Sequence, residues 1–208
     1  MKGAKYTKQP MANQFQLSKE QCPKTQAEKE AMSHAPYYNA VVTIMYLMVC
    51  TRPDLAYAIN VLSRYMADPG RQHWEAMKWV FKYLLGIIEV GPRFSKRTDN
   101  TMIKGYSDVD YTGDRDTKKS ISVYVFLIWG NCISWKVQQQ LVVALSITES
   151  ETKHVEVKYH FIWDKVTQGV VQINKVLIEE NPVDMGTKIV TLTKFNHNLN
   201  LLGIIDGG

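Results

Sequence analysis

Hydrophobic positions recur with the period of an α-helix along the first half of the chain. The segment Tyr37–Cys50 is apolar almost all round, which predicts a well-buried helix. Thr51-Arg52-Pro53-Asp54 then has the cap residue, early proline and early acidic residue of a helix start. The helix that follows ends at Asp68-Pro69-Gly70, and a third amphipathic helix is predicted from about Gln72 to Leu85. We expect these three helices to form a compact unit.

The period changes after Gly91-Pro92. Three short segments are rich in β-branched and aromatic residues and are predicted to be consecutive antiparallel strands: Ile103–Val109, Ser122–Trp129 and Cys132–Val137. Gly130-Asn131 is the predicted hairpin turn between the last two. Another strand is predicted over Val170–Ile178, and Val155–Val166 is a mixed amphipathic segment.

The two ends of the chain lack periodicity. Residues 1–35 are polar and are predicted to be an irregular arm, and the tail over residues 191–208 is predicted to fray. The fold class is therefore α+β, with a helical N-terminal unit followed by a mixed sheet with flanking helices.

Composition narrows the class of protein without fixing its function. The chain has 208 residues, 45% hydrophobic and 22% charged, which is typical of a soluble globular protein. Its net charge of +5 permits a polyanionic partner without requiring one. Cys22, Cys50 and Cys132 form no C-x-x-C pair, so neither a zinc site nor a disulfide framework is predicted. We expect an intracellular protein, cytoplasmic or nuclear, with no secretory signal and no membrane span, because the apolar run Ala40–Cys50 is too short to cross a bilayer.

Acidic residues gather at the ends of the predicted elements. Asp108 and Asp110 close the first strand, within the stretch GYSDVDYTGD, and Asp184 opens a late helix. Glu149 and Glu151 stand at another predicted helix start. Carboxylates from separate elements can converge on Mg²⁺, which prefers oxygen ligands. Acidic residues at strand ends and helix starts are equally typical of solvated or capping positions, so spacing alone leaves both interpretations open.

The order of five motifs is more specific. The chain begins this series with a helical block, PYYNAVVTIMYLMVCTRPDLAYAINVLSRYMADPGRQHWEAMKWVFKYLLG. It is followed by GYSDVDYTGD, KKSISVYVFLIWGNCISWKVQQQLVVALSITESE, KHVEVKYHFIWDKV and EENPVDMGTK. In this order they resemble the C-terminal part of Pol polyproteins from copia-type LTR retrotransposons. The resemblance implies the helical end of the reverse transcriptase over residues 36–91 and a truncated ribonuclease-H-like domain over residues 100–190. In that family the ribonuclease H domain hydrolyses the RNA strand of RNA–DNA hybrids with two Mg²⁺ ions.

The resemblance also assigns roles to single residues. Asp108, Glu151 and Asp184 match metal-binding catalytic carboxylates of the family, whereas Asp110, Asp114 and Glu149 are expected to be supporting or exposed. Trp135 and Lys136 are candidates for contact with nucleic acid, although packing within the sheet is the stronger expectation for Trp135.

The chain departs from the family pattern at several places. Glu151 runs through Thr152 directly into Lys153-His154, so several dozen residues are missing, including the third metal-binding Asp. Val123 replaces a family Gly, Gly186 a family Leu, and Trp129 a turn Gly. The chain has no Y-x-D-D motif, which excludes polymerase activity for this chain alone.

Three functional hypotheses follow. The first is a catalytically degenerate fragment of a Pol polyprotein, with the rest of Pol as its ancestral partner. The second is a nuclease in which Asp108, Glu151 and Asp184 hold one Mg²⁺. The third is a module that binds an RNA–DNA hybrid or DNA without cleaving it. Loss of one carboxylate weakens a site for two closely spaced cations, which favours the first hypothesis.

Overall fold

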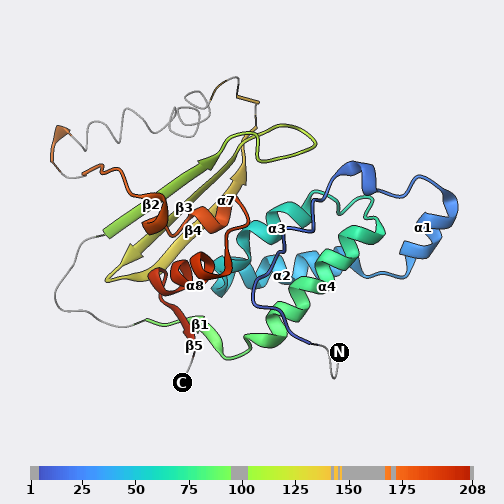
Figure 1. Ribbon diagram of the computed structural model, residues 1–208, viewed down its shortest axis with the longest axis horizontal. Helices are drawn as coiled ribbons and strands as arrows, with labels where there is room; N and C mark the ends of the chain where they lie inside the picture. Colours follow the sequence, from blue (N-terminus) through green and yellow to red (C-terminus); the bar gives the residue numbers. More distant parts are fainter. Residues whose placement is uncertain are drawn as a thin grey trace.

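The computed structural model describes residues 5–94, 103–141, 143–144, 146, 167–169 and 172–206 of the chain. A group of helices lies beside a three-stranded antiparallel sheet, and two further helices from the C-terminal part of the chain lie between them (Figure 1). The mixed α+β class predicted from the sequence is confirmed.

The helical half follows the predicted periodicity closely. Its helices are α1 (Gln26–Ser33), α2 (Tyr37–Thr51), α3 (Ala56–Ser63) and α4 (Arg71–Gly86), with short 3₁₀ turns at Lys19–Gln21 and Pro53–Leu55. Thr51, the predicted cap residue, is instead the last residue of α2, and Asp54 does not bind the backbone N–H groups of a helix start as expected. Its carboxylate instead pairs with the guanidinium of Arg52, at 2.9 and 2.6 Å, and accepts a 2.7 Å hydrogen bond from the Tyr83 hydroxyl. Both carboxylate oxygens of Asp54 are hydrogen-bonded in this buried ion pair, which offsets part of the cost of removing the two charges from water.

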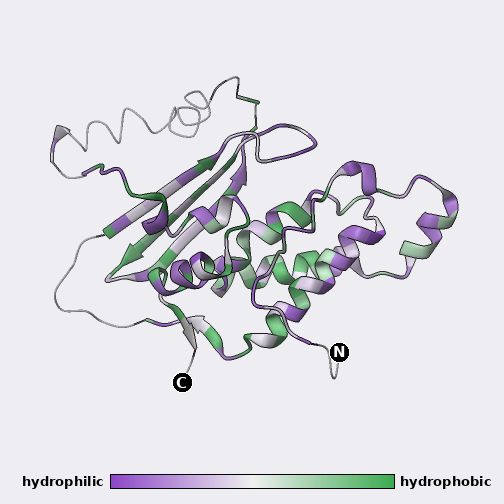
Figure 2. Cartoon of the chain, in the orientation of Figure 1, coloured by the Kyte–Doolittle hydropathy of each residue, from purple (hydrophilic) through white to green (hydrophobic). Residues whose placement is uncertain are grey.

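Helix α2 differs from its prediction. Tyr37, Ala40, Val41 and Ile44 are buried on one face, but the opposite face is open, and Tyr46 there is 75% exposed. Figure 2 shows hydrophobic residues along this helix. The sequence thus predicts more burial than the described chain provides.

The sheet has the strand order β2-β3-β4, formed by β2 (Ile103–Asp110), β3 (Ile121–Ile128) and β4 (Asn131–Gln139). β3 and β4 are joined by the two residues Trp129 and Gly130, with φ of 52° and 75°. Positive φ at both positions defines the turn type that matches the twist of a two-residue hairpin. The turn therefore begins one residue earlier than predicted.

The ends of the chain are more ordered than expected. The region predicted to fray contains α8 (Leu192–Leu201) and β5 (Ile204–Asp206), and β5 pairs with β1 (Val90–Pro92). The N-terminal arm packs tightly, because a Cβ on Gly70 would lie 1.8 Å from the carbonyl oxygen of Gln21. The strand predicted over 170–178 is not formed in its described residues, where the chain is irregular before the 3₁₀ turn Ile178–Glu180.

One hydrophobic core joins the helical half to the sheet. Helices α3 and α7 (Asp184–Thr187) pack against the same sheet face, which is formed by alternate residues of β3. The buried members of this continuous core include Tyr37, Ile44, Leu55, Ile59, Leu62, Met77, Tyr83, Ile121, Val123, Val125, Leu202 and Ile204. The sheet face under α7 is therefore the place where side chains of β2 meet the C-terminal elements.

Candidate functional site

Asp108 and Asp110 lie on the sheet face that α7 covers. They pair across the ladder with Val123 and Ile121, two buried residues of β3, and side chains alternate along a strand. Both aspartates are half-buried at the edge of this core. The Thr187 hydroxyl donates a 2.8 Å hydrogen bond to Oδ2 of Asp108, which ties the end of α7 to β2.

Asp184, the first residue of α7, is brought to the same neighbourhood but is already paired. Its side chain is 4% exposed. Oδ1 lies 2.5 Å from Nζ of Lys188, the residue that follows α7. Oδ2 forms a close ion pair with Nζ of Lys194 on α8. Both carboxylate oxygens of Asp184 therefore face ammonium groups of the protein itself.

Asn181 fixes the entry to α7. Its side-chain amide donates to the carbonyl oxygen of Ser107 at 3.3 Å, and its side-chain oxygen accepts the backbone N–H of Val183 at 3.4 Å. The Asn-Pro-Val-Asp sequence thus attaches the start of α7 to β2, beside Asp108.

The charges of Asp108, Asp110, Asp184 and Lys188 affect one another's pKa values. Burial raises the pKa of Asp110, the charge of Lys188 acts to lower it, and the charges of Asp108 and Asp184 raise it further. Partial burial acts to lower the pKa of Lys188, but its hydrogen bond and charge interaction with Asp184, together with Asp108 and Asp110, outweigh burial and raise the pKa. In this cluster the positive lysines thus offset the negative aspartates.

These residues do not fit a two-magnesium site. Mg²⁺ needs oxygen ligands that are free to coordinate it in near-octahedral geometry, and both oxygens of Asp184 are held by lysines. Among the described residues, no group of three or more His, Cys, Asp or Glu side chains is arranged to hold a metal ion. Glu151, the third predicted ligand, and Glu149 lie outside the described residues. Asp108 and Asp184 are thus brought together, but as parts of a lysine-neutralised cluster.

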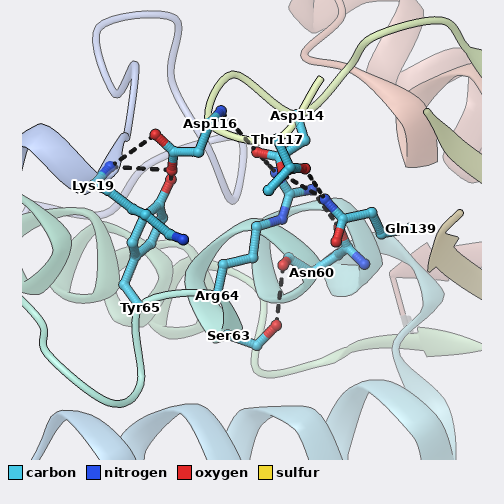
Figure 3. Close-up of polar contacts among 9 residues, drawn as sticks. All are labelled: Lys19, Asn60, Ser63, Arg64, Tyr65, Asp114, Asp116, Thr117 and Gln139. Atoms are coloured by element: carbon cyan, nitrogen blue, oxygen red, sulfur yellow. Dashed lines mark hydrogen bonds and ion pairs between the residues drawn. The ribbon is translucent and has the colours of Figure 1, made fainter. Parts of the chain in front are cut away.

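A second polar cluster surrounds Asp114 (Figure 3). This carboxylate, in a residue 2% exposed, accepts hydrogen bonds from Arg64 Nη1 at 2.9 Å, from the backbone N–H of Asp116 at 3.2 Å, and from the side chains of Thr117 and Gln139. Burial acts to raise the pKa of Asp114, but the hydrogen bond from Thr117 and the charge of Arg64 outweigh it and hold the pKa below its usual value.

The neighbouring Asp116 connects the same loop to the N-terminal arm. Its two oxygens accept the backbone N–H of Lys19, both at 3.0 Å, and Oδ2 also accepts the Tyr65 hydroxyl at 3.0 Å. The loop between β2 and β3 is therefore held to α3 and to the arm. Asp114, expected from the sequence to be supporting or exposed, is buried.

The two candidates for contact with nucleic acid lie in different environments. Trp135 is half-buried and its Nε1 donates a 3.1 Å hydrogen bond to the Met48 carbonyl, so it packs as expected. Lys136 is exposed, and its contact with nucleic acid stays a prediction. No helix in the described part of the chain has the length and apolar character needed to cross a bilayer.

The lysines that neutralise Asp184 were missed in the sequence. Lys188 lies four residues after Asp184, a spacing that could have indicated an ion pair on a helix. Lys194 lies on a separate helix, in a region expected to fray, so the sequence carried no signal for its contact.

Comparison with known proteins relates nearly the whole chain to Pol polyproteins. It is 36% identical over 253 residues to the "Retrovirus-related Pol polyprotein from transposon TNT 1-94" of Nicotiana tabacum, a match that covers 98% of this chain and 19% of that protein. It is 27% identical over 218 residues to the Pol polyprotein from transposon RE2 of Arabidopsis thaliana, covering 81% of this chain and 15% of that protein. The chain thus spans about a fifth or less of the length of these relatives.

A third relative is short. The "Secreted RxLR effector protein 161" of Plasmopara viticola is 47% identical over 120 residues, which is 58% of this chain and 84% of that protein. No protein-family model and no solved structure matches the chain. The tobacco match runs over 253 residues whereas this chain has 208, so at least 45 residues of the matched region have no counterpart here. That difference agrees with the internal deletion expected from the sequence.

Proposed function

Because the chain belongs to the Pol polyproteins of copia-type retrotransposons, we propose that residues 100–190 descend from a ribonuclease H domain and no longer cleave RNA–DNA hybrids efficiently. The ancestral role is hydrolysis of the RNA strand during reverse transcription. The degenerate fragment is thus preferred over the surviving nuclease.

The observation that carries this proposal is the pairing of Asp184. Two metal ions about 4 Å apart need several carboxylate oxygens, because these ligands offset the repulsion between the cations. Asp184 directs one oxygen to Lys188 and the other to Lys194, and Asp108 accepts a hydrogen bond from Thr187. A cation would have to displace two ammonium groups from a carboxylate that is 4% exposed.

The test is a cleavage assay with a labelled RNA–DNA hybrid, with and without Mg²⁺. The wild-type chain and the Asp108→Asn variant are compared beside an active ribonuclease H. We expect neither form of the chain to cut the hybrid above background, while the active enzyme degrades it. Mg²⁺-dependent cleavage by the wild type that disappears in Asp108→Asn would overturn the proposal.

The same samples distinguish the alternative of binding without cleavage. A shift of the hybrid band without cutting, weakening steeply as salt rises, would identify a nucleic-acid-binding module that uses phosphate contacts. Binding and cleavage are read in separate lanes, so each outcome is assigned to one function.

A further inference from the structure

We propose that the open face of α2 is a docking surface for another part of the Pol polyprotein to which the chain belongs. This inference rests on family membership and does not depend on whether the chain cleaves hybrids. Helix α2 carries apolar residues on both faces, but the described part of the chain buries only one of them.

The open face carries a continuous apolar stripe. Its members are large side chains exposed by 42–75%: Tyr38, Val42, Tyr46 and Val49. At 100° per residue they fall within about 80° of the helix circumference, and they extend over roughly 17 Å of its length. Single exposed apolar residues are ordinary, whereas a contiguous apolar patch is typical of an interaction site.

The stripe continues into a hollow of about 290 Å³ between α2, α3 and β4. Val49 belongs to both, and the rest of the apolar lining is formed by Met45, Met48, Ala56, Ile59, Trp135 and Val137. Lys136 lies at the same hollow and is exposed. A partner on α2 can therefore place an apolar side chain into this hollow as well as cover the stripe.

The chemistry of the helix indicates an apolar partner. None of the 15 residues of α2 is acidic or basic. A charged surface laid on this face would lose its hydration without gaining an ion pair from α2, which costs free energy. The occupant is thus an uncharged, apolar surface.

The relatives indicate where such a surface comes from. The matched region is only 19% of the tobacco polyprotein, so most of that chain lies outside it. A stripe of four side chains is small for a free dimer, which needs about 800 Å² on each partner. It is enough for a segment of the same polypeptide, because covalent linkage raises the effective concentration to the millimolar range. We therefore assign the face to the remaining part of Pol rather than to a second copy.

Cys50 provides a reporter for this face. Its thiol is exposed and lies one helical turn after Tyr46 of the stripe, whereas Cys132 is buried. The experiment compares the rate of maleimide labelling at Cys50, measured by mass spectrometry of its peptide, in two proteins. One is the isolated chain, and the other is the tobacco polyprotein in which this chain replaces the matched region.

We expect labelling of Cys50 to be at least about tenfold slower in the chimera. Val42→Lys should restore fast labelling there, whereas Thr43→Lys, on the polar part of the same exposed face, should not. Slow labelling of Cys132 in both proteins verifies that the chain is folded. If the chimera does not fold, the tobacco polyprotein without its matched region is added in trans to the isolated chain at rising concentration. Protection is then expected to increase with that concentration, because the covalent linkage is absent.

Equal labelling rates with and without the rest of Pol would overturn the inference. Protection that grows with the concentration of the isolated chain would also overturn it, because a second copy would then cover the face. Neither result changes the hybrid-cleavage assay, so a failure of this inference is distinguishable from a failure of the proposed function.

Discussion

The side chain of Val123 on β3 lies directly over Gly186 on α7. A Cβ placed on Gly186 would lie 3.0 Å from Cγ1 and 3.2 Å from Cγ2 of Val123, tighter than ordinary van der Waals contact. In the sequence these residues stood out as separate departures from the family, a Val in place of Gly and a Gly in place of Leu. In the structure they are neighbours, and the larger residue on the strand occupies the space left by the smaller residue on the helix.

This contact predicts coupled effects of substitution at the two positions. Gly186→Leu should lower the free energy of unfolding by about 1–3 kcal/mol through overpacking against Val123, which is 2% exposed. Val123→Gly should destabilise by a similar amount, because it leaves a cavity and a flexible residue within a strand. The double variant should recover part of the loss, with a coupling energy of about 0.5–3 kcal/mol measured by urea unfolding. Strictly additive losses would show that the two residues do not compensate for each other.

Because two lysines pair with Asp184, the single substitution Asp184→Asn should markedly lower the free energy of unfolding. Asp184→Asn leaves Lys188 and Lys194 without their shared carboxylate, and the side chains of these lysines are 49% and 21% exposed. We expect a loss of about 1–3 kcal/mol in the free energy of unfolding, below the range for a fully buried pair because water reaches both ammonium groups.

The matched control for Asp184 is Glu75→Gln. Glu75 pairs with Lys78 at 2.5 Å, but the side chains are 48% and 35% exposed. Its loss should stay below about 0.5 kcal/mol, as is typical of surface ion pairs. If Asp184→Asn were no more damaging than this control, the ion cluster would not hold α7 and α8 together.

Because His73 is buried as a neutral ring, we expect the free energy of unfolding to depend on pH between 7 and 5. The His73 ring is fully buried and stacked on the ring of Tyr65, with 4.0 Å between the ring centroids. Its Nδ1 accepts a hydrogen bond from the backbone N–H of Gly70 at 2.9 Å. Nε2 therefore carries the proton and donates a hydrogen bond to the Ser18 carbonyl at 3.2 Å. Burial lowers the pKa of His73 from its ordinary 6.5 and outweighs the opposing effects of the hydrogen bond to the Ser18 carbonyl and of the charges of Asp116 and Asp68. A lowered pKa in the folded state means that the unfolded chain takes up the proton first.

The stability from neutral His73 is therefore fully present above about pH 6.5 and is lost as the pH falls from there towards the folded-state pKa. The slope can reach about 1.4 kcal/mol per pH unit for one proton. Urea unfolding of His73→Gln at pH 7, 6 and 5 should show a smaller decline than the wild type over this interval. His34→Gln, at an exposed residue, should keep the wild-type decline. An unchanged slope in His73→Gln would assign the acid sensitivity to other groups.

The elements that the sequence predicted well are those with a strong local signal. The amphipathic period of α4 predicted residues 72–85, close to the observed Arg71–Gly86. The β-branched and aromatic runs located all three strands of the sheet to within two residues. For α2 the sequence correctly gave a helix, but the expectation of full burial was wrong, because burial depends on chain segments that the apolar pattern does not identify.

The features that the sequence did not predict depend on distant partners. β5 is three residues long and exists through its pairing with β1, more than a hundred residues earlier, so local periodicity could not indicate it. Residues 172–177 belong to the strand predicted over Val170–Ile178 but form no strand, because propensity alone does not provide a neighbouring strand. The sequence suggested Asp108 and Asp184 as candidate metal ligands. It did not indicate that two lysines pair with Asp184, one of them from a separate helix.

The turn between β3 and β4 gives a last prediction, in which a substitution increases stability. Trp129 has φ of 52° and is followed by Gly130 at 75°. A bulky residue in the left-handed region costs roughly 1–2 kcal/mol, whereas glycine adopts it freely. Trp129 is 37% exposed, so it also buries less apolar surface than a core residue does. Trp129→Gly should therefore raise the free energy of unfolding by about 1 kcal/mol, measured by urea unfolding.

Trp129→Ala is the control, because it removes the same ring but keeps a Cβ at positive φ, and it should give no gain. Equal stability of the Gly and Ala variants would show that the turn stores no backbone strain at residue 129.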